Sequence, residues 1–207
     1  MSLPQSELRD YLNQFYKLSD KEYELFSSYF NLITFSPKQR MISEGESEQF
    51  IYYVVSGIFR KFFTRKKSEV VIGFYKERDI CHSAVSYYTG LPSNISIEAI
   101  EQSICLQIKR IDIEYLFTQI PGLERIFRGV LATLYVKKDM DQMDNLTYSK
   151  KERFLKFCDQ SPELLQRVPQ KFLASFLEIA PETFCRLKRV RYEMAKKKFS
   201  NEYREAS

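Results

Sequence analysis

Apolar residues at helical spacing mark two parts of the chain. Over residues 5–31 they recur every three or four positions, and an interruption at Ser19 is typical of a helix N-cap. The same period returns after residue 110 and predicts a helix over residues 112–119. Pro121 and Gly122 then break the chain, so we expect a second and longer helix to begin there.

Between these helices the pattern changes to short segments rich in β-branched and aromatic residues. Residues 95–99 and 104–108 alternate apolar and polar side chains with a period of two, as half-buried strands do. The expected strands are Gln49–Val55, Ile58–Thr64, Val70–Tyr75, Ile95–Ile100 and Ile104–Ile108. Gly45, Gly57, Gly73 and Gly90 supply turns. Many short strands with frequent turns predict a sandwich or barrel, and the flanking helices make the expected fold class α+β.

A stripe of four apolar residues runs along the longer helix. Leu123, Phe127, Val130 and Leu134 follow one another at steps of four, three and four, which is the spacing of a helix that packs on a partner helix. Two explanations stay open at this point. The stripe either forms a dimer contact or packs on the β-rich part of its own chain.

The last fifty residues contain two short amphipathic helices in sequence. Ser149 and Glu152 fit a capping box that opens a new segment. Pro169 then opens a helix with an apolar face, and Pro181 starts another after a connection at residues 177–179. Two such helices joined by three or four residues predict a helix-turn-helix, and the small Ala174 lets them approach closely.

Charge separates the C-terminal part from the rest. The net charge is +5, yet residues 150–207 hold 14 Lys and Arg against 8 Asp and Glu, whereas residues 1–149 hold 18 against 19. This asymmetry favours a polyanion as the partner of the C-terminal part.

The residue types on the second helix fit double-stranded DNA. Arginine can read guanine with two hydrogen bonds, glutamate can accept from cytosine, and threonine can contact a base or a phosphate. The expected DNA-binding residues are Gln170, Lys171, Glu182, Thr183, Arg186, Lys188 and Arg189. Further phosphate contacts are expected from Arg191, Lys196, Lys197 and Lys198.

Several classes of protein are not expected. No apolar run approaches the roughly 20 residues that span a bilayer, and the N-terminus lacks a basic segment followed by an apolar one, so we expect a cytoplasmic protein without membrane contact. The four cysteines form no C-x-x-C pair and His82 is the only histidine, so neither a metal site nor another cofactor is expected. With no catalytic motif, the chain is not expected to be an enzyme.

The stretch VPQKFLASFLEIAPETFCRLKR, residues 168–189, resembles the helix-turn-helix of the cyclic-AMP receptor protein and fumarate–nitrate regulator (Crp/Fnr) family. Upstream, Glu44-Gly45-Glu46, then residues 52–57 and Arg60, resemble the first half of that family's cyclic-nucleotide-binding β-roll. The resemblance covers residues 10–190. It implies a jelly-roll β-barrel sensor, a long connecting helix and a winged-helix-like domain.

The resemblance also implies domain bounds and partners. The expected domains are a sensor over residues 1–120, a connecting and dimerisation helix over 121–148, and a helix-turn-helix DNA-binding domain over 149–207. Expected partners are double-stranded DNA, a second copy of the chain in a homodimer, and an unknown small-molecule effector. The alternative is an orphan sensor module that acts through protein contacts rather than DNA.

Three residues of the helix-turn-helix depart from the family pattern. Glu178 stands at the turn position that is usually glycine, Ala180 replaces a capping polar residue, and Pro181 cannot donate a hydrogen bond. The tail after residue 198 is short and polar, so a wing is expected to be missing or rudimentary.

The sensor departs from the family pattern at the residues that hold a cyclic phosphate. His82-Ser83 stands where the family has Gly-Glu, and Ser93-Asn94 stands where it has an arginine. We therefore expect weak or no binding of cyclic AMP. The candidate pocket for another small molecule comprises Phe74, Cys81, His82, Ser83, Ser93 and Asn94. His82 is either a ligand contact, a pH-sensitive group, or a side chain bonded to its neighbours.

Overall fold

The computed structural model describes residues 3–205, and it describes side chains from Ser6 to Glu193. The chain divides into two compact units, one ending at Asp139 and the other beginning at Met140. The division falls inside a single long helix rather than at its two ends, so the three-part arrangement expected from the sequence stays a prediction.

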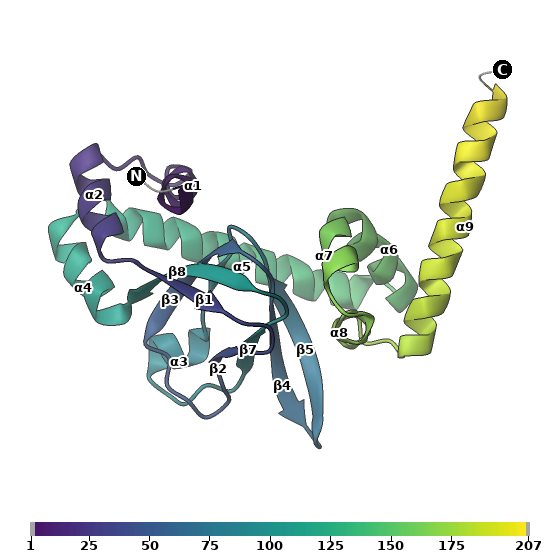
Figure 1. The fold of residues 1–207 in the computed structure, drawn as a ribbon, viewed down its shortest axis with the longest axis horizontal. Coiled ribbons are helices and arrows are strands. Elements are labelled where there is room, and N and C mark those ends of the chain that lie inside the picture. The colour runs from purple at the N-terminus through teal and green to yellow at the C-terminus, as the bar shows by residue number, and fades with distance from the viewer. Residues whose placement is uncertain (1–2, 206–207) are drawn as a thin grey trace. The chain divides into compact units, whose positions relative to one another are not determined.

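The first unit combines eight strands with helices at both of its ends (Figure 1). In chain order its elements are α1 (Leu3–Leu12), α2 (Asp20–Ser28), β1 (Asn31–Phe35), β2 (Arg40–Ile42), β3 (Phe50–Ser56), β4 (Phe59–Arg65), β5 (Ser68–Tyr75), β6 (Ile80–Cys81), α3 (Ala84–Thr89), β7 (Ser96–Ala99), β8 (Ser103–Lys109), α4 (Arg110–Gln119) and the first part of α5 (Leu123–Thr147). All five expected strands are present, and Ser19 caps α2 through a complete capping box with Glu22.

The strands form two antiparallel four-stranded sheets, with the orders β1-β8-β3-β6 and β2-β7-β4-β5. The prediction of a barrel is therefore wrong in one respect. Each strand pairs only with strands of its own sheet, so the two sheets do not join into a closed barrel. Among residues 3–205, β1 and β6 at the edges of one sheet, and β2 and β5 at the edges of the other, each pair on one side only. The fold is a β-sandwich with open edges.

Two apolar cores lie on opposite faces of the first sheet. Tyr52 and Val54 of β3 point between the sheets and pack with residues of the second sheet such as Phe59 and Ile97. Their neighbour Tyr53 points the other way, into a core shared with the helices. The first sheet is thus buried on both faces, and this explains why β3 lacks a simple alternation of apolar and polar residues in the sequence.

The apolar stripe on α5 packs on its own unit. Leu123 and Val130 are buried, and Phe127 and Leu134 pack against the same core as the outer face of the first sheet. Of the two explanations that the sequence left open, the structure shows the second. Gly129 lets the N-terminal segment approach α5 closely, because a Cβ at this position would lie 2.5 Å from a ring carbon of Phe15.

The second unit is helical throughout its described residues after α5. Its elements are α6 (Lys150–Gln160), α7 (Pro162–Arg167), α8 (Gln170–Phe176) and α9 (Pro181–Glu205). The capping box of Ser149 and Glu152 is formed. Phe154 and Phe184 are fully buried and meet edge to face, with ring centroids 5.4 Å apart. From Pro181 to Glu205 the chain is one helix, so no strand of a wing occurs within that range, contrary to a winged-helix-like domain.

Candidate functional site

A tight turn joins α8 to α9 in the second unit. Glu178 adopts a left-handed backbone with φ 55°, at the position where the sequence resemblance calls for glycine. The backbone N–H of Glu178 donates to the carbonyl of Ser175 at 3.1 Å, and that of Ile179 donates to Ala174 at 3.0 Å. These bonds close the end of α8. The left-handed backbone costs a non-glycine residue about 1–2 kcal/mol.

Arg153 of α6 offsets part of that cost. Its Nη2 donates to the carbonyl oxygen of Leu177 at 3.2 Å and lies 3.9 Å from the carboxylate of Glu178. A guanidinium at the end of α8 donates to a carbonyl that the helix leaves unpaired. Its positive charge also interacts favourably with the negative end of the helix dipole. The sequence alone did not single out Arg153 for this role, since 25 residues separate it from Glu178.

The start of α9 presents a polar, largely basic surface. Glu182, Arg186, Lys188 and Arg189 are exposed, and Thr183 is half-buried beside the fully buried Phe184. Within the described part of the chain, Arg186 makes no ion pair or side-chain hydrogen bond, whereas Arg189 pairs with Glu193 at 3.1 Å. The guanidinium of Arg186 therefore keeps its full set of donors available.

The remaining expected DNA contacts fall into three groups. Gln170 and Lys171 are exposed at the start of α8. Arg191 is engaged with α6, since it donates to the carbonyl of Cys158 and to Asp159 at 3.3 and 3.0 Å. It therefore braces α9 rather than facing away from the unit. The side chains of Lys196, Lys197 and Lys198 lie outside the described residues.

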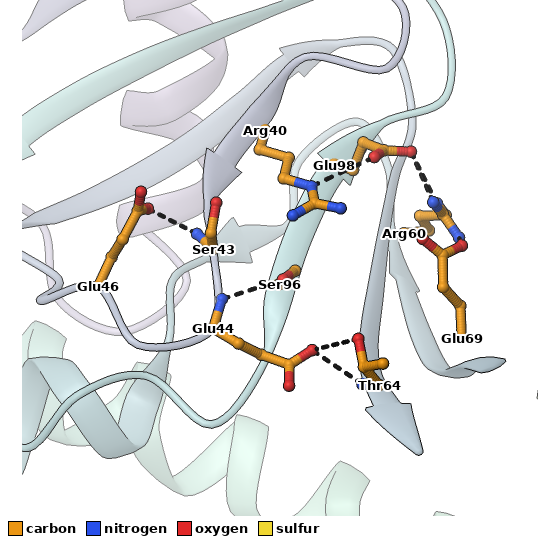
Figure 2. Close-up of polar contacts among 9 residues, drawn as sticks. All are labelled: Arg40, Ser43, Glu44, Glu46, Arg60, Thr64, Glu69, Ser96 and Glu98. Atoms are coloured by element: carbon orange, nitrogen blue, oxygen red, sulfur yellow. Dashed lines mark hydrogen bonds and ion pairs between the residues drawn. The ribbon is translucent and has the colours of Figure 1, made fainter. Parts of the chain in front are cut away.

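In the first unit, the residues resembling a β-roll motif form a network of polar contacts between strands (Figure 2). Glu44 accepts from the backbone N–H and the hydroxyl of Thr64, at 2.8 and 3.0 Å. Arg60, only 4% exposed, donates to Glu98 through Nε and Nη2 at 2.9 and 2.7 Å. This motif therefore ties the strands of the second sheet together.

A buried carboxylate lies at the start of the short helix α3. Glu48 is 4% exposed and accepts from the backbone N–H groups of Phe50 at 3.1 Å and Ser83 at 3.3 Å. Burial raises the pKa of Glu48, and these N–H donors partly oppose the rise. The hydroxyl groups of Ser83 and Ser93 are 2.8 Å apart, so the two serines are linked beside this carboxylate.

Lys61 faces the space between the two sheets. It lies opposite the buried Ile97 in the pairing of β4 with β7, and side chains directly opposite share a face. Burial lowers the pKa of Lys61, and Lys138 lowers it further. Neither Lys61 nor Glu48 was singled out by the sequence, because only the fold buries these two charged residues.

The six expected pocket residues do not form one group. Cys81 lies in the core between the sheets, and burial raises the pKa of its thiol well above the usual value. Phe74 lies opposite Arg60 and so points to the other face of the second sheet, while its neighbour Tyr75 packs against that core. Asn94 is exposed. Only Ser83 and Ser93 are in contact as expected.

His82 points toward the other core. It lines a cavity with Tyr53 and Ile80 on the face of the first sheet that the helices cover. Burial lowers the pKa of His82 to about 4. The imidazole is therefore neutral near pH 7.

The comparisons with known proteins agree with this architecture. Residues 32–119 match the family model of the cyclic nucleotide-binding domain. Among solved structures, the catabolite activator protein of Thermus thermophilus is 21% identical with a TM-score of 0.54, and the alignment covers 89% of this chain and 88% of that one. FixK2 of Bradyrhizobium japonicum is 17% identical with a TM-score of 0.66 over 80% of this chain and 86% of its own. The fold of this chain is therefore similar to the folds of these two proteins, which are Crp/Fnr regulators.

The resemblance inferred from the sequence is thereby confirmed. CooA of Carboxydothermus hydrogenoformans, in a mutant form, gives a TM-score of 0.63 at 15% identity, covering 82% of this chain and 79% of that one. Among curated protein sequences no match to the chain was found. The cyclic nucleotide-binding domain comprises all eight strands of the β-sandwich except the first residue of β1, together with α3 and α4.

No helix of the described residues is long and apolar enough to cross a membrane. Within the same part of the chain, no three side chains of histidine, cysteine, aspartate or glutamate come together as metal ligands.

Proposed function

We propose that this chain is a cytoplasmic DNA-binding transcriptional regulator, with α8 and α9 as its helix-turn-helix and α9 as the helix that enters the major groove. The observation that carries the proposal is the unpaired, exposed Arg186, one turn after Glu182 near the start of a helix that Phe184 anchors from behind. Recognition helices use residues in this position to contact base edges. The proposal assigns no catalytic step to the chain.

We propose a homodimer formed along α5. Its core-facing stripe is occupied within the first unit, but α5 also carries large exposed apolar residues at other positions. These are Leu131, Tyr135, Val136, Met140, Met143 and Leu146. Val136, Met140 and Met143 are spaced by four and three, which is the spacing of a helix–helix contact. A two-fold dimer would offer two copies of α9 to successive major grooves, about 34 Å apart.

We propose that the sensor domain does not respond to cyclic AMP. Bound phosphates accept hydrogen bonds from backbone N–H groups at a helix start, and Glu48 already occupies that of Ser83. The buried carboxylate would also repel a phosphate, and no arginine stands at Ser93 or Asn94 to compensate. The effector is then a small molecule of another class.

Titration of the full chain with cyclic AMP is expected to give no saturable binding at concentrations up to about 1 mM, since a bound phosphate would lack a charge-assisted contact worth about 1.5–3 kcal/mol. Isothermal calorimetry measures this directly, with adenosine as the control for any contribution of the base and sugar. Saturable micromolar binding of cyclic AMP would contradict the proposal.

Replacing Arg186 with alanine is expected to weaken binding to a selected duplex by about 1–3 kcal/mol and to flatten the preference for that duplex over base-substituted versions. Lys171→Ala should instead weaken binding to all duplexes equally and reduce the salt slope by about one. Fluorescence anisotropy at several salt concentrations measures both effects.

Lys21→Ala is the charge-matched control, because Lys21 is exposed on α2 in the other unit. It should leave affinity and preference unchanged. If Arg186→Ala retains the full base preference, α9 is not the reading helix. If the unsubstituted chain shows no salt-dependent binding to any duplex, the sensor acts through protein contacts instead.

A further inference from the structure

A cavity lies beside the first sheet, on the face that the helices cover. Its volume is about 40 Å³, and all of its lining residues belong to the first unit. Ile51 and Ile108 of the sheet form one wall. Leu12 of α1, Phe26 of α2 and Ile126 of α5 lie across from them.

This cavity is distinct from the space between the two sheets. Side chains alternate along β3, so Ile51 and Tyr53 line the cavity while Tyr52 and Val54 point into the core of the sandwich. The cavity is therefore separated by the thickness of a sheet from the core that contains Cys81. A ligand here would leave that core untouched.

His82 supplies a polar group to an otherwise apolar wall. It is only 6% exposed, and its ring packs edge to face against Tyr87 and Tyr88, with centroids 5.4 and 5.6 Å away. Among the residues that the structure describes, neither ring nitrogen of His82 has a hydrogen-bond partner. Buried polar groups are nearly always paired, so a fully unpaired buried imidazole points to a bound partner.

The protonation state of His82 determines which hydrogen-bonding group a bound molecule must have. Burial holds its pKa at about 4, so near pH 7 the neutral ring provides one N–H donor and one acceptor nitrogen. A hydroxyl group can satisfy either nitrogen, as it both donates and accepts. A charged group would be desolvated by the surrounding leucine, isoleucine and phenylalanine side chains, and no Lys, Arg, Asp or Glu is among the residues that line the cavity, although the charge of Lys61 reaches His82.

The mouth of the cavity can adjust to the size of a ligand. Tyr88 and Leu131 line it while remaining 46% and 41% exposed, so both side chains have room to rotate. Apolar cavities of about 150 Å³ hold benzene. A ring-sized molecule therefore enters the present cavity only as these two side chains move outward.

We propose that this cavity binds a small uncharged molecule, apolar except for one hydroxyl group that hydrogen-bonds to His82. The molecule would touch α5 at Ile126, Phe127 and Leu134, so its binding would alter how α5 packs on the sheet. Its role as an effector rests on the proposed regulatory function. Its binding does not.

Phenol and toluene are matched probes, because they differ by a hydroxyl in place of a methyl group. Binding of each to the full chain is measured by NMR, where the ring nitrogens of His82 give unambiguous signals from the only histidine. Phenol is expected to shift these signals. In His82→Leu, the affinity of phenol relative to toluene should fall roughly two- to tenfold, as expected for one net hydrogen bond, while toluene binding persists.

Asn94→Leu is the control, since this exposed residue makes the same change from polar to apolar outside the cavity. It should leave the ratio unchanged. The proposal is overturned if millimolar phenol leaves the His82 signals unmoved, or if His82→Leu keeps the original ratio. Should His82→Leu fail to fold, the response of the His82 signals to phenol in the unsubstituted chain still shows whether phenol binds beside His82. DNA binding enters neither measurement, so the two proposals can fail separately.

Discussion

Replacing Arg60 with methionine is expected to lower the free energy of unfolding of the first unit by about 3–5 kcal/mol, the usual cost of removing one partner from a buried ion pair. The loss is large because Glu98, with its side chain only 11% exposed, would keep Arg40 alone, at 3.6 Å, as its cationic partner. Arg60 also stacks over Phe62 with its guanidinium carbon 4.0 Å from the ring centre. Urea unfolding followed by circular dichroism measures the change.

The double variant Arg60→Met with Glu98→Leu tests the cause. Since it removes both buried charges, it should regain much of the lost stability. Arg9→Met is the control for an exposed pair, because Asp20, the partner of Arg9, is 91% exposed, and its effect should be much smaller. If the double variant is less stable than Arg60→Met alone, the uncompensated Glu98 charge is not what destabilises the single variant.

Replacing Phe184 with alanine is expected to destabilise the second unit by about 3–5 kcal/mol, the typical cost of truncating a buried phenylalanine. The side chain is fully buried, meets Phe154 edge to face, and joins α9 to α6. A small unit has a total stability of only about 5–15 kcal/mol, so α8 and α9 should open frequently. Hydrogen exchange should show faster exchange in these helices and unchanged protection in β3 and β8.

Tyr192→Ala is the matched control, since Tyr192 is an aromatic residue of the same helix and its side chain is 72% exposed. It should leave exchange in both units as it was. Equal protection of α8 and α9 in Phe184→Ala would show that Phe184 does not hold the second unit together. A parallel loss of protection in β3 would show that the two units unfold together.

Much of this fold is predictable because local signals and tertiary packing agree. Ser19 and Ser149 each begin a helix through a capping box, and Pro162 and Pro181 each open one. All five expected strands are present, but the structure has eight strands in all. The strands β1, β2 and β6 were not predicted. β2 has three residues and β6 has two, which is too short for a periodic pattern of apolar and polar residues to be recognised.

The candidate sites were predictable only where a residue acts locally. The left-handed backbone of Glu178 follows from its place between two helices. The contact of Arg153 with that turn joins segments 24 residues apart, and the contact of Glu48 with Ser83 joins segments 35 residues apart. The pocket residues were grouped by position in the sequence, whereas the pleat sends Cys81 and its neighbour His82 into different cores.

Glu48 also bears on any attempt to engineer nucleotide recognition into this scaffold. Introducing Gly-Glu and arginine at the family positions would leave the carboxylate of Glu48 already bound to the backbone N–H of residue 83. Removing the carboxylate of Glu48 first would leave the backbone N–H groups of Ser83 and Phe50 without an acceptor in the ligand-free protein. That protein would therefore be less stable than the present one. An engineered nucleotide site therefore lowers the stability of the ligand-free protein in return for binding. Each stepwise route to it passes through a variant that is less stable than the present protein or still binds the nucleotide weakly.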